Sequence, residues 1–257
     1  MDLIAGPFIG EFGWELCAWQ GVIRAMAPNY DKVMIYGKPG HQYLYEDFMD
    51  EYFEFEPQGV QPNMWMNEGT KFMLPEFHKN ACWIKPQQFS LMANAPEQVF
   101  FRYGVNAERT AIAYHARSLD KYGSGYMNWA DDNWKELIER YPKTDVVCIG
   151  TKDGASYLGG EDLRGASLEE TCKVLSRAAV LVGPSSGAIH LGSLCATPHV
   201  VWSGHYRNKS RYEDLWNPFK TPVKAICPAS SPWDGKILWQ PETYEIAAEI
   251  GSFLCAA

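Results

Sequence analysis

The residues best suited to ligand chemistry form a turn of small and hydroxyl side chains in the second half of the chain. An apolar run at 180–182 ends at Gly183, Pro-Ser-Ser-Gly follows at 184–187, and Ala-Ile-His at 188–190 begins a predicted helix. Small residues let a ligand approach the backbone, and a helix N-terminus offers unpaired N–H groups with partial positive charge. The pattern favours a seat for a diphosphate. The alternative is an ordinary strand–helix turn capped by serine; no Gly-Lys-Ser/Thr follows, so the turn is not a Walker P-loop.

Two further predicted strand ends carry polar side chains. His115-Ala116-Arg117-Ser118 places an imidazole, a guanidinium and a hydroxyl together, and arginine suits bidentate contact with phosphate. The alternative for Arg117 is an ion pair with Asp120 or another nearby acid. Gly150-Thr151-Lys152 follows the next strand, where Lys152 is either a phosphate or ribose contact or a solvated loop lysine. Ligands of open α/β sheets bind beyond such strand ends.

Two carboxylates near the N-terminus are candidates for a general base. The first apolar strand is followed by Gly-Glu-Phe-Gly-Trp-Glu at 10–15. A carboxylate is ionised at neutral pH and can accept a proton from a reacting hydroxyl. We favour Glu11, which lies in the predicted loop, over Glu15 in the first helical turn, where compensation of the helix dipole is the simpler role.

Hydrophobic periodicity indicates the elements that would position these residues. The chain opens as strand, helix, strand and helix, then passes through a proline-containing stretch at 55–96 with one or two short strands and the end of a short helix at 97–103. From residue 110 strands and helices alternate regularly, which is typical of a parallel sheet with crossover helices. Ser167 and Glu170 form a predicted capping box. The predicted strands are 2–8, 32–36, 110–115, 145–149, 179–182 and 199–202, and the predicted helices are 16–27, 42–50, 133–140, one from 167, 188–195 and 241–257.

Composition narrows the class of protein. The 257 residues carry a formal net charge of −8, which disfavours a large basic surface for duplex DNA. No basic segment followed by a long apolar stretch opens the chain, and no run of about 18 apolar residues occurs, so we predict a cytoplasmic protein without a membrane span. The seven cysteines form no CxxC pair. These cysteines do not indicate a metal site, and the sequence contains no Asp-x-Asp pair that could hold one. No cofactor is expected.

The second half resembles the heptosyltransferase-like family 9 glycosyltransferases, strongest over residues 110–257. The stretches 162–170, 175–191 and 196–198 follow the pattern DLxGxTSLxEL…LxxADLVVGxDSGxxHLAxAxGTP of that family. The chain departs from the pattern at Ser185, where the family has Asp. The N-terminal half matches more loosely, because Trp14 stands where the family has an Asp.

The resemblance implies a role for each matching position. The turn would cradle the donor diphosphate, with His190 behind it, and Leu163 would contact the base through its backbone. The loop at 205–212 would border the donor, although its cations among aromatic side chains also fit a nucleic-acid backbone, and Glu213 with Asp214 would offset its charge if it is simply solvated. The donor-binding residues expected are His115, Arg117, Ser118, Gly150, Thr151, Lys152, Leu163, Ser185, Ser186, Gly187, Ala188, His190, Arg207 and Arg211.

The resulting prediction is a GT-B glycosyltransferase: two doubly wound Rossmann-like α/β domains facing a cleft, the N-terminal one reduced. The acceptor-side domain is expected at 1–105, the nucleotide-sugar domain at 106–240 and a terminal helix at 241–257. The resemblance implies inverting transfer. The absence of an Asp-x-Asp pair favours transfer without a metal, in which the helix dipole and cations neutralise the leaving diphosphate. The acceptor stays open between a saccharide and a hydroxymethylated DNA base, as in phage-type enzymes. A nucleotide-sugar epimerase or hydrolase of the same fold, and a non-catalytic nucleotide-binding module, also fit the sequence.

Overall fold

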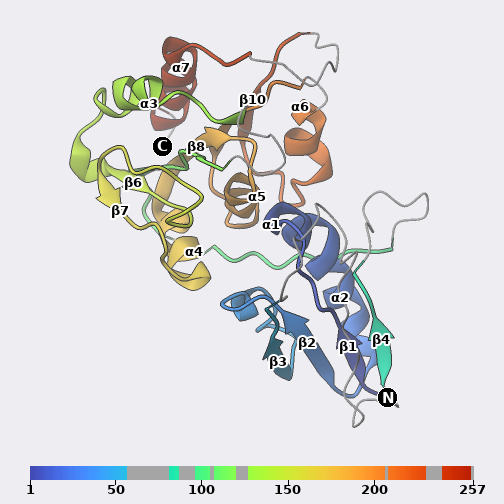
Figure 1. The fold of residues 1–257 in the computed structure, drawn as a ribbon. Coiled ribbons are helices and arrows are strands. Elements are labelled where there is room, and N and C mark those ends of the chain that lie inside the picture. Colours follow the sequence, from blue (N-terminus) through green and yellow to red (C-terminus); the bar gives the residue numbers. More distant parts are fainter. Residues whose placement is uncertain are drawn as a thin grey trace. The chain divides into compact units, whose positions relative to one another are not determined.

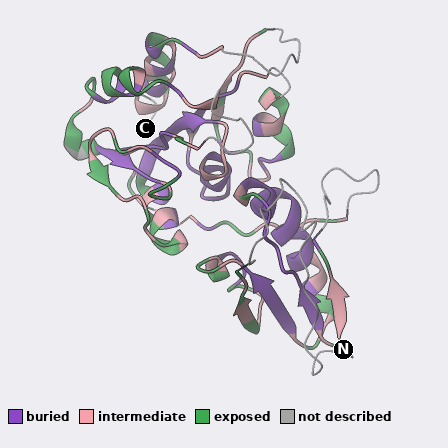
Figure 2. Ribbon diagram, in the orientation of Figure 1, coloured by how far each residue is buried: buried purple, intermediate pink, exposed green. Residues whose placement is uncertain are grey.

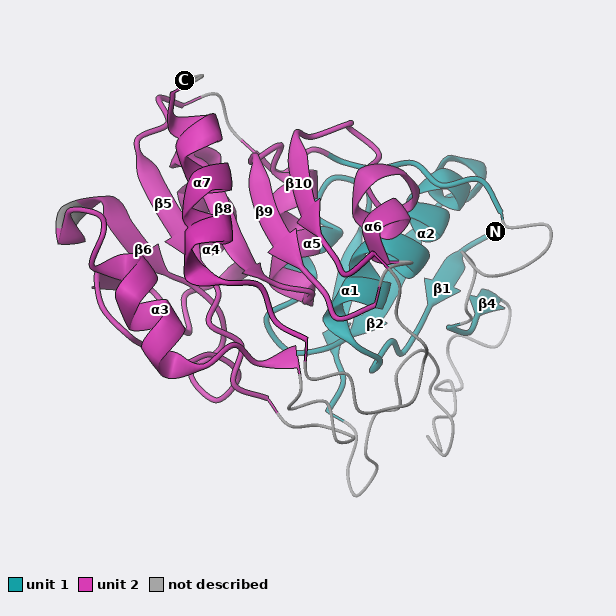
Figure 3. Cartoon of the chain, turned by 90° about the horizontal axis from the view of Figure 1, so that it is seen from above, with its two compact units in different colours: residues 1–101 teal, residues 102–257 magenta. Residues whose placement is uncertain are grey.

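The chain folds into two compact units, residues Met1–Phe101 and Arg102–Ala257, each built around its own parallel sheet (Figures 1 and 3). This computed structural model describes residues 1–56, 81–86, 96–104, 107–119, 127–205, 208–229 and 239–255. The terminal helix, expected as a separate segment, is counted within the second unit. The predicted α/β class with two Rossmann-like units is confirmed by the two parallel sheets.

The sheet of the first unit has the strand order β3-β2-β1-β4, and every neighbouring pair is parallel. The central strands are buried, whereas the edge strands are more exposed (Figure 2). The order places the carboxyl ends of β1 and β2 side by side, where loops from both can contribute to one site. The strands are β1 Leu3–Ala5, β2 Val33–Gly37, β3 Glu51–Glu54 and β4 Cys82–Ile84.

One continuous helical stretch follows β1. It consists of α1 (Phe12–Trp14), a π-helical turn (Glu15–Trp19), α2 (Gln20–Met26) and a 3-10 turn (Ala27–Asn29). Pro28, in that last turn, ends the helix as expected, since a proline removes a backbone donor. The helix begins at Phe12, four residues before the predicted start at residue 16.

Two predicted helices of the first half are wrong. Instead of a helix at 42–50, the chain forms one 3-10 turn, Gln42–Leu44. Asp47 pairs with buried Arg24 at 2.7 Å and Asp50 accepts the Val33 N–H at 2.7 Å, so these acids tie the segment to its neighbours. Residues 97–103 are not helical. Their backbone bonds elsewhere, since the Val99 N–H donates to the carbonyl of Gly21.

The sheet of the second unit has the order β10-β9-β8-β5-β6-β7, again parallel throughout. Strand β8, the longest, is fully buried at the centre. The strands are β5 Ala111–Tyr114, β6 Val146–Cys148, β7 Glu161–Asp162, β8 Ala178–Pro184, β9 His199–Trp202 and β10 Val223–Ile226. The helices are α3 Asp131–Ile138, α4 Leu168–Arg177, α5 Gly187–Leu194, α6 Asn208–Ser210 and α7 Thr243–Leu254, with short turns at Lys143–Asp145 and Arg211–Leu215.

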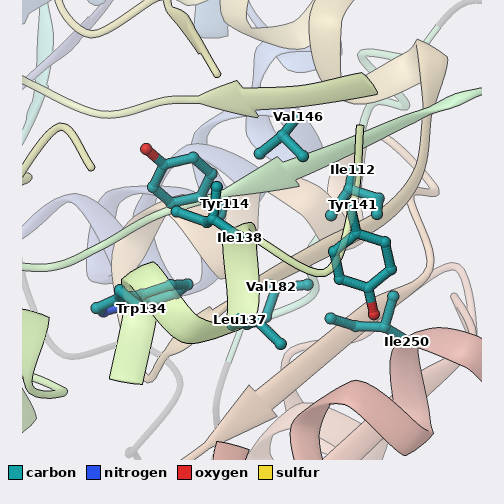
Figure 4. A pocket seen from close by; sticks show the side chains of 9 residues that line it. All are labelled: Ile112, Tyr114, Trp134, Leu137, Ile138, Tyr141, Val146, Val182 and Ile250. Atoms are coloured by element: carbon teal, nitrogen blue, oxygen red, sulfur yellow. The ribbon is translucent and has the colours of Figure 1, made fainter. Parts of the chain in front are cut away.

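Helices cover both faces of this sheet. Val180 and Val182 pack in one cluster with side chains of α3 and α7, whereas Leu181, which points the other way, lies against Gly192 of α5. Figure 4 shows a small apolar cavity between β5, β6, β8 and the helices α3 and α7. It is lined by Ile112, Tyr114, Trp134, Leu137, Ile138, Tyr141, Val146, Val182 and Ile250. The wholly apolar side chains and tyrosines mark this region as core rather than as a site.

The helix predicted at 133–140 begins earlier, at Asp131, with Ala130 as its N-cap, so Asp131 and Asp132 lie in its first turn. Among the described residues no helix is both long and apolar enough to cross a bilayer.

Candidate functional site

Helix α5 begins at the carboxyl end of β8 with its N-terminus uncapped. Its N-cap residue, Ser186, has an extended backbone, but the serine hydroxyl makes no capping hydrogen bond. The first backbone N–H groups of the helix are therefore available to a ligand, and the helix dipole favours a negative one. The turn at 185–188 is partly exposed, whereas β8 before it and residues 189–195 after it are buried. The structure thus presents an accessible helix N-terminus, of a kind that suits an anion, on a buried support.

The hydroxyl of Ser186 instead shares a hydrogen bond of 3.1 Å with Nδ1 of His115, at the end of neighbouring strand β5. His115 is 7% exposed. Burial, and secondarily the charge of Arg117, lowers the pKa of His115 to about 4. The imidazole is therefore neutral at neutral pH and fixes the serine without adding charge. Two residues that the sequence placed on separate strand ends are brought together.

Glycines make room for this imidazole. A Cβ on Gly150 would lie 2.8 Å from Cδ2 of His115, and the backbone of Gly150 has φ +124°, which side chains rarely adopt. A Cβ on Gly183 would approach the His115 carbonyl to 3.0 Å. Position 150 therefore needs glycine for the strand ends to close around His115, whereas a side chain at 183 would require the neighbouring strand end to shift slightly.

Ser185 is held from the other side by Tyr212. The buried Tyr212 hydroxyl lies 2.8 Å from the Ser185 hydroxyl, to which it donates. The Tyr212 ring stacks on His190 at 4.5 Å between centroids, so His190 lies beneath the turn. Burial, and then the charge of Arg211, lowers the pKa of His190 well below its ordinary range. The guanidinium of Arg211 rests on the ring of Trp216, 4.7 Å from its centroid.

Several other predicted donor residues follow strands β5, β6 and β7 of the same sheet. The Arg117 guanidinium donates to the Leu119 carbonyl at 2.7 Å and to Asn128 Oδ1 at 2.5 Å, while Ser118 is exposed. Asp120, the alternative partner of Arg117, lies outside the described residues, as does Arg207.

Thr151 and Lys152 are exposed after β6, next to a backbone turn closed by the hydrogen bond from Gly165 N–H to the Gly150 carbonyl at 2.7 Å. The Leu163 N–H already donates to the Cys148 carbonyl at 3.0 Å, and its carbonyl accepts from Ala166 at 3.2 Å. A base contact through the Leu163 backbone would therefore have to use the second lone pair of this carbonyl.

In the first unit the two candidate carboxylates differ sharply. Glu11 is exposed and is the N-cap residue of α1. Glu15 has no exposed surface, and its oxygens lie 2.8 Å from His41 Nδ1 and 2.9 Å from the Tyr45 hydroxyl. Lys38 Nζ lies 3.6 Å from the same carboxylate. The sequence prediction missed these partners, although Lys38 directly follows β2 and the strand-end rule applied to the second half would have found it.

Within the described ranges, no group of three or more His, Cys, Asp or Glu side chains is arranged to hold a metal ion.

The two parallel sheets, together with the solved structures that the chain resembles, place it in the GT-B class of fold. No protein-family model and no curated protein matches the sequence. Solved structures do match over the whole chain, and because their sequence identities are low, the likeness shows the fold alone. A family 9 glycosyltransferase from Veillonella parvula has a TM-score of 0.62 at 10% identity, with 100% of this chain and 97% of that chain covered.

Two proteins of E. coli are similar to the same extent. The ADP-heptose LPS heptosyltransferase II has a TM-score of 0.60 at 12% identity, with 99% of this chain and 98% of that chain covered. The heptosyltransferase WaaC, solved with ADP, has a TM-score of 0.56 at 14% identity, with coverages of 98% and 99%. The chain therefore has the heptosyltransferase-like fold of family 9 glycosyltransferases, which the sequence resemblance implied.

Proposed function

We propose that this protein is a glycosyltransferase that moves a sugar from a nucleotide-sugar donor to an acceptor hydroxyl. The observation that carries the proposal is the uncapped, partly exposed N-terminus of α5, with Ser186 tied to buried His115 instead of closing the helix. A diphosphate would complete the backbone hydrogen bonds that the serine leaves open. The fold shared with family 9 glycosyltransferases supports the same reading.

The proposed reaction is a direct displacement. The acceptor oxygen attacks the anomeric carbon as a base removes its proton, and the bond from that carbon to the diphosphate breaks. The nucleoside diphosphate leaves with the electron pair, and the configuration at the anomeric carbon inverts. The helix dipole and the guanidinium of Arg211 would stabilise the leaving group, so we propose transfer without a metal or cofactor.

The choice of donor to test first follows from the ligands bound in similar solved structures and from the chemistry of the turn. WaaC was solved with ADP, and the TibC heptosyltransferase with an ADP-heptose, which makes ADP-sugars the first donors to test. At Ser185 the turn carries a neutral hydroxyl held by Tyr212 where the family pattern has a carboxylate. A change in charge beside the sugar phosphate would alter donor preference, so other nucleotides and sugars belong in the test.

A saccharide is the acceptor that we propose. Nothing among the described residues supports a hydroxymethylated DNA base as the acceptor. The epimerase or hydrolase alternative needs a cluster of carboxylates with a histidine, and the described residues of the second unit contain no such cluster. The cytoplasmic location expected from the sequence stays a prediction.

The test places an acid in the first turn of α5. In Ala188→Asp the carboxylate would occupy the charge environment of the diphosphate while stabilising the helix by about 0.3–1 kcal/mol. We expect unchanged folding and at least about tenfold weaker binding of ADP, or of whichever nucleoside diphosphate binds the wild type. Thermal shift and calorimetry measure both, because a ligand at about 100 times its Kd adds about 2.7 kcal/mol of stability.

Tyr244→Asp is the matched control, because it puts the same acid at the same position of α7, where Tyr244 is exposed. It should bind nucleotide like the wild type. Equal binding by Ala188→Asp and the wild type would overturn the diphosphate seat. Absence of sugar transfer or donor hydrolysis with every nucleotide sugar, despite nucleotide binding, would leave a non-catalytic nucleotide-binding module.

A further inference from the structure

A buried carboxylate and a half-buried imidazole form a pair at the carboxyl edge of the first sheet. Glu15 has no exposed surface, and its Oε2 lies 2.8 Å from Nδ1 of His41, of which about 20% of the side chain is exposed. The carboxylate therefore cannot touch a ligand itself, whereas the imidazole can.

The surroundings of Glu15 hold it in the ionised form. Burial alone raises the pKa of this carboxyl, but the charge that His41 carries when protonated, the charge of Lys38, and the hydrogen bonds from His41 and Tyr45 outweigh burial and lower it. The Tyr45 hydroxyl donates to Oε1 at 2.9 Å, which leaves Oε2 to face the imidazole.

An ionised carboxylate can only accept a hydrogen bond, so Nδ1 must carry the proton whenever the His41 ring is in its neutral form. Its Nε2 then holds the free lone pair. Within the described part of the chain, Glu15 is the sole side chain that hydrogen-bonds the His41 ring. This arrangement makes Nε2 a proton acceptor with a fixed tautomer.

The backbone fixes the imidazole in place. The His41 N–H donates to the Lys38 carbonyl at 3.1 Å, and the His41 carbonyl accepts from Leu44 at 3.0 Å, which starts the 3-10 turn. The Tyr52 hydroxyl donates to the same Lys38 carbonyl at 2.7 Å. The edge of Phe12 packs on the His41 ring with 5.4 Å between centroids.

The pair lies where a ligand of this sheet is expected. Glu15 belongs to the turn and helix that follow β1, and His41 to the turn that follows β2. These strands are parallel neighbours, with Ala5 opposite Ile35 near their carboxyl ends. The ends of parallel strands form the ligand-binding edge of open α/β sheets.

We propose that His41 is the general base for the acceptor hydroxyl and that Glu15 is the residue that positions it; this rests on the glycosyl transfer proposed above. The acceptor proton moves to Nε2 of His41 as the oxygen attacks the anomeric carbon and the diphosphate departs with the bonding electrons. The imidazolium that forms is stabilised by Glu15 and later loses its proton to water. The assignment replaces the direct role expected for either carboxylate.

The first arm of the test is spectroscopic and independent of turnover. Nitrogen-15 NMR of the wild type should show neutral His41 protonated at Nδ1, with the signal assigned by its loss in His41→Ala. In Glu15→Gln the side-chain amide can donate to Nδ1, so the tautomer should change to Nε2–H. A wild-type His41 protonated at Nε2 would overturn the proposal without any variant having to fold.

The second arm measures transfer, or hydrolysis, of the donor that the wild type uses, beginning with ADP-heptose. We expect kcat to fall about 10²–10⁴-fold in His41→Ala and in Glu15→Gln, with the Kd of the donor unchanged. Added imidazole should restore part of the rate to His41→Ala but not to Glu15→Gln, whose ring is still present. Gln42→Ala, an exposed change in the same turn, is the matched control.

The outcomes separate the two proposals. A wild type that turns over its donor while His41→Ala keeps full kcat would overturn the base and leave glycosyl transfer standing. A large loss in Glu11→Gln together with full activity in His41→Ala would assign the base to Glu11. A wild type that binds nucleotide but transfers no sugar would overturn the proposed function, and the base with it.

Discussion

At the scale of single residues, the second unit places a neutral imidazole where a phosphate site would ordinarily gather cations. His115 stays uncharged at neutral pH because burial lowers its pKa to about 4. Its hydrogen bond to Ser186 holds the serine hydroxyl away from the α5 N-terminus. The positive potential at the turn therefore comes from the helix end rather than from His115.

Gly150→Ala is expected to disturb this arrangement. The new Cβ would meet Cδ2 of His115 at 2.8 Å and require a side chain at φ +124°. We expect a loss of about 1–3 kcal/mol in the free energy of unfolding from the backbone strain, with more from the contact, and weaker nucleotide binding. Urea unfolding and calorimetry measure these two effects.

Gly159→Ala separates strain from contact. Its backbone also has a positive φ, +140°, but the new Cβ would only touch Ile138 at 3.4 Å. It should lose stability through strain alone and keep nucleotide affinity. Equal effects of both substitutions on nucleotide affinity would show that the space around His115 is unimportant for the turn.

At the scale of elements, two helices on the same face of the second sheet differ in how their N-termini are capped. Helix α4 has a full capping box, in which Ser167 accepts the Glu170 N–H at 3.2 Å and Glu170 accepts the Ser167 N–H at 2.9 Å. Helix α5 has no side-chain cap although its N-cap residue is also a serine. A residue type that commonly caps helices thus caps α4, whereas in α5 it bonds His115 and leaves the helix N-terminus without a side-chain cap.

Ser167→Ala should therefore lower stability without affecting ligand binding. We expect a loss of about 1 kcal/mol, because the substitution leaves the first turn of α4 without its cap. Chemical denaturation gives the change, and nucleotide titration should give the wild-type Kd. Ser252→Ala, on the exposed side of α7, should stay within about 0.5 kcal/mol of the wild type. A similar loss in both would argue against the capping box.

At the scale of the whole molecule, buried histidines make the second unit sensitive to acid. His115, His190 and His199 are all buried there, and burial lowers the pKa of each. For His115 and His199 the folded value is about 4, against about 6.5 when exposed. Between these pH values the unfolded chain binds more protons than the folded one, so stability falls as pH falls.

We expect the free energy of unfolding to decrease as pH is lowered from about 6.5 to about 4, by up to about 3 kcal/mol for each of His115 and His199. Glu15 acts in a lower range, because its lowered pKa removes stability only as pH falls below about 4.5. Urea unfolding at about pH 7, 6 and 5 measures the slope.

His199→Gln should flatten the slope by removing one titrating group, since His199 bonds only within the core, at 3.0 Å to the Thr197 carbonyl. Constant stability across the range would mean that the buried imidazoles are hydrated or charged in the folded protein.

The sequence by itself determined four of the strands and the main helices of the second unit, although β7 and β10 were not predicted. Strand His199–Trp202 was predicted to the residue, and the capping box at Ser167 and the strand–turn–helix around Ser185 are confirmed. These features depend on local periodicity and on side chains three residues apart, which one sequence displays. The wrong helices at 42–50 and 97–103 have the opposite cause: partners far along the chain, such as Arg24 and Gly21, bind these segments.

Only the tertiary structure decided which polar groups meet. Ser186 and His115 are 71 residues apart and join because β5 pairs with β8, with Tyr114 opposite Val182. Glu15 and His41 are 26 residues apart and meet because β1 pairs with β2. A hydrophobic pattern gives the order of strands along the chain but not their order or register in the sheet, which depend on packing across the whole core. The sequence therefore named the turn at Ser185 and Ser186 and two candidate carboxylates, and the strand pairing brought His115 beside the turn and His41 beside one of those carboxylates, Glu15.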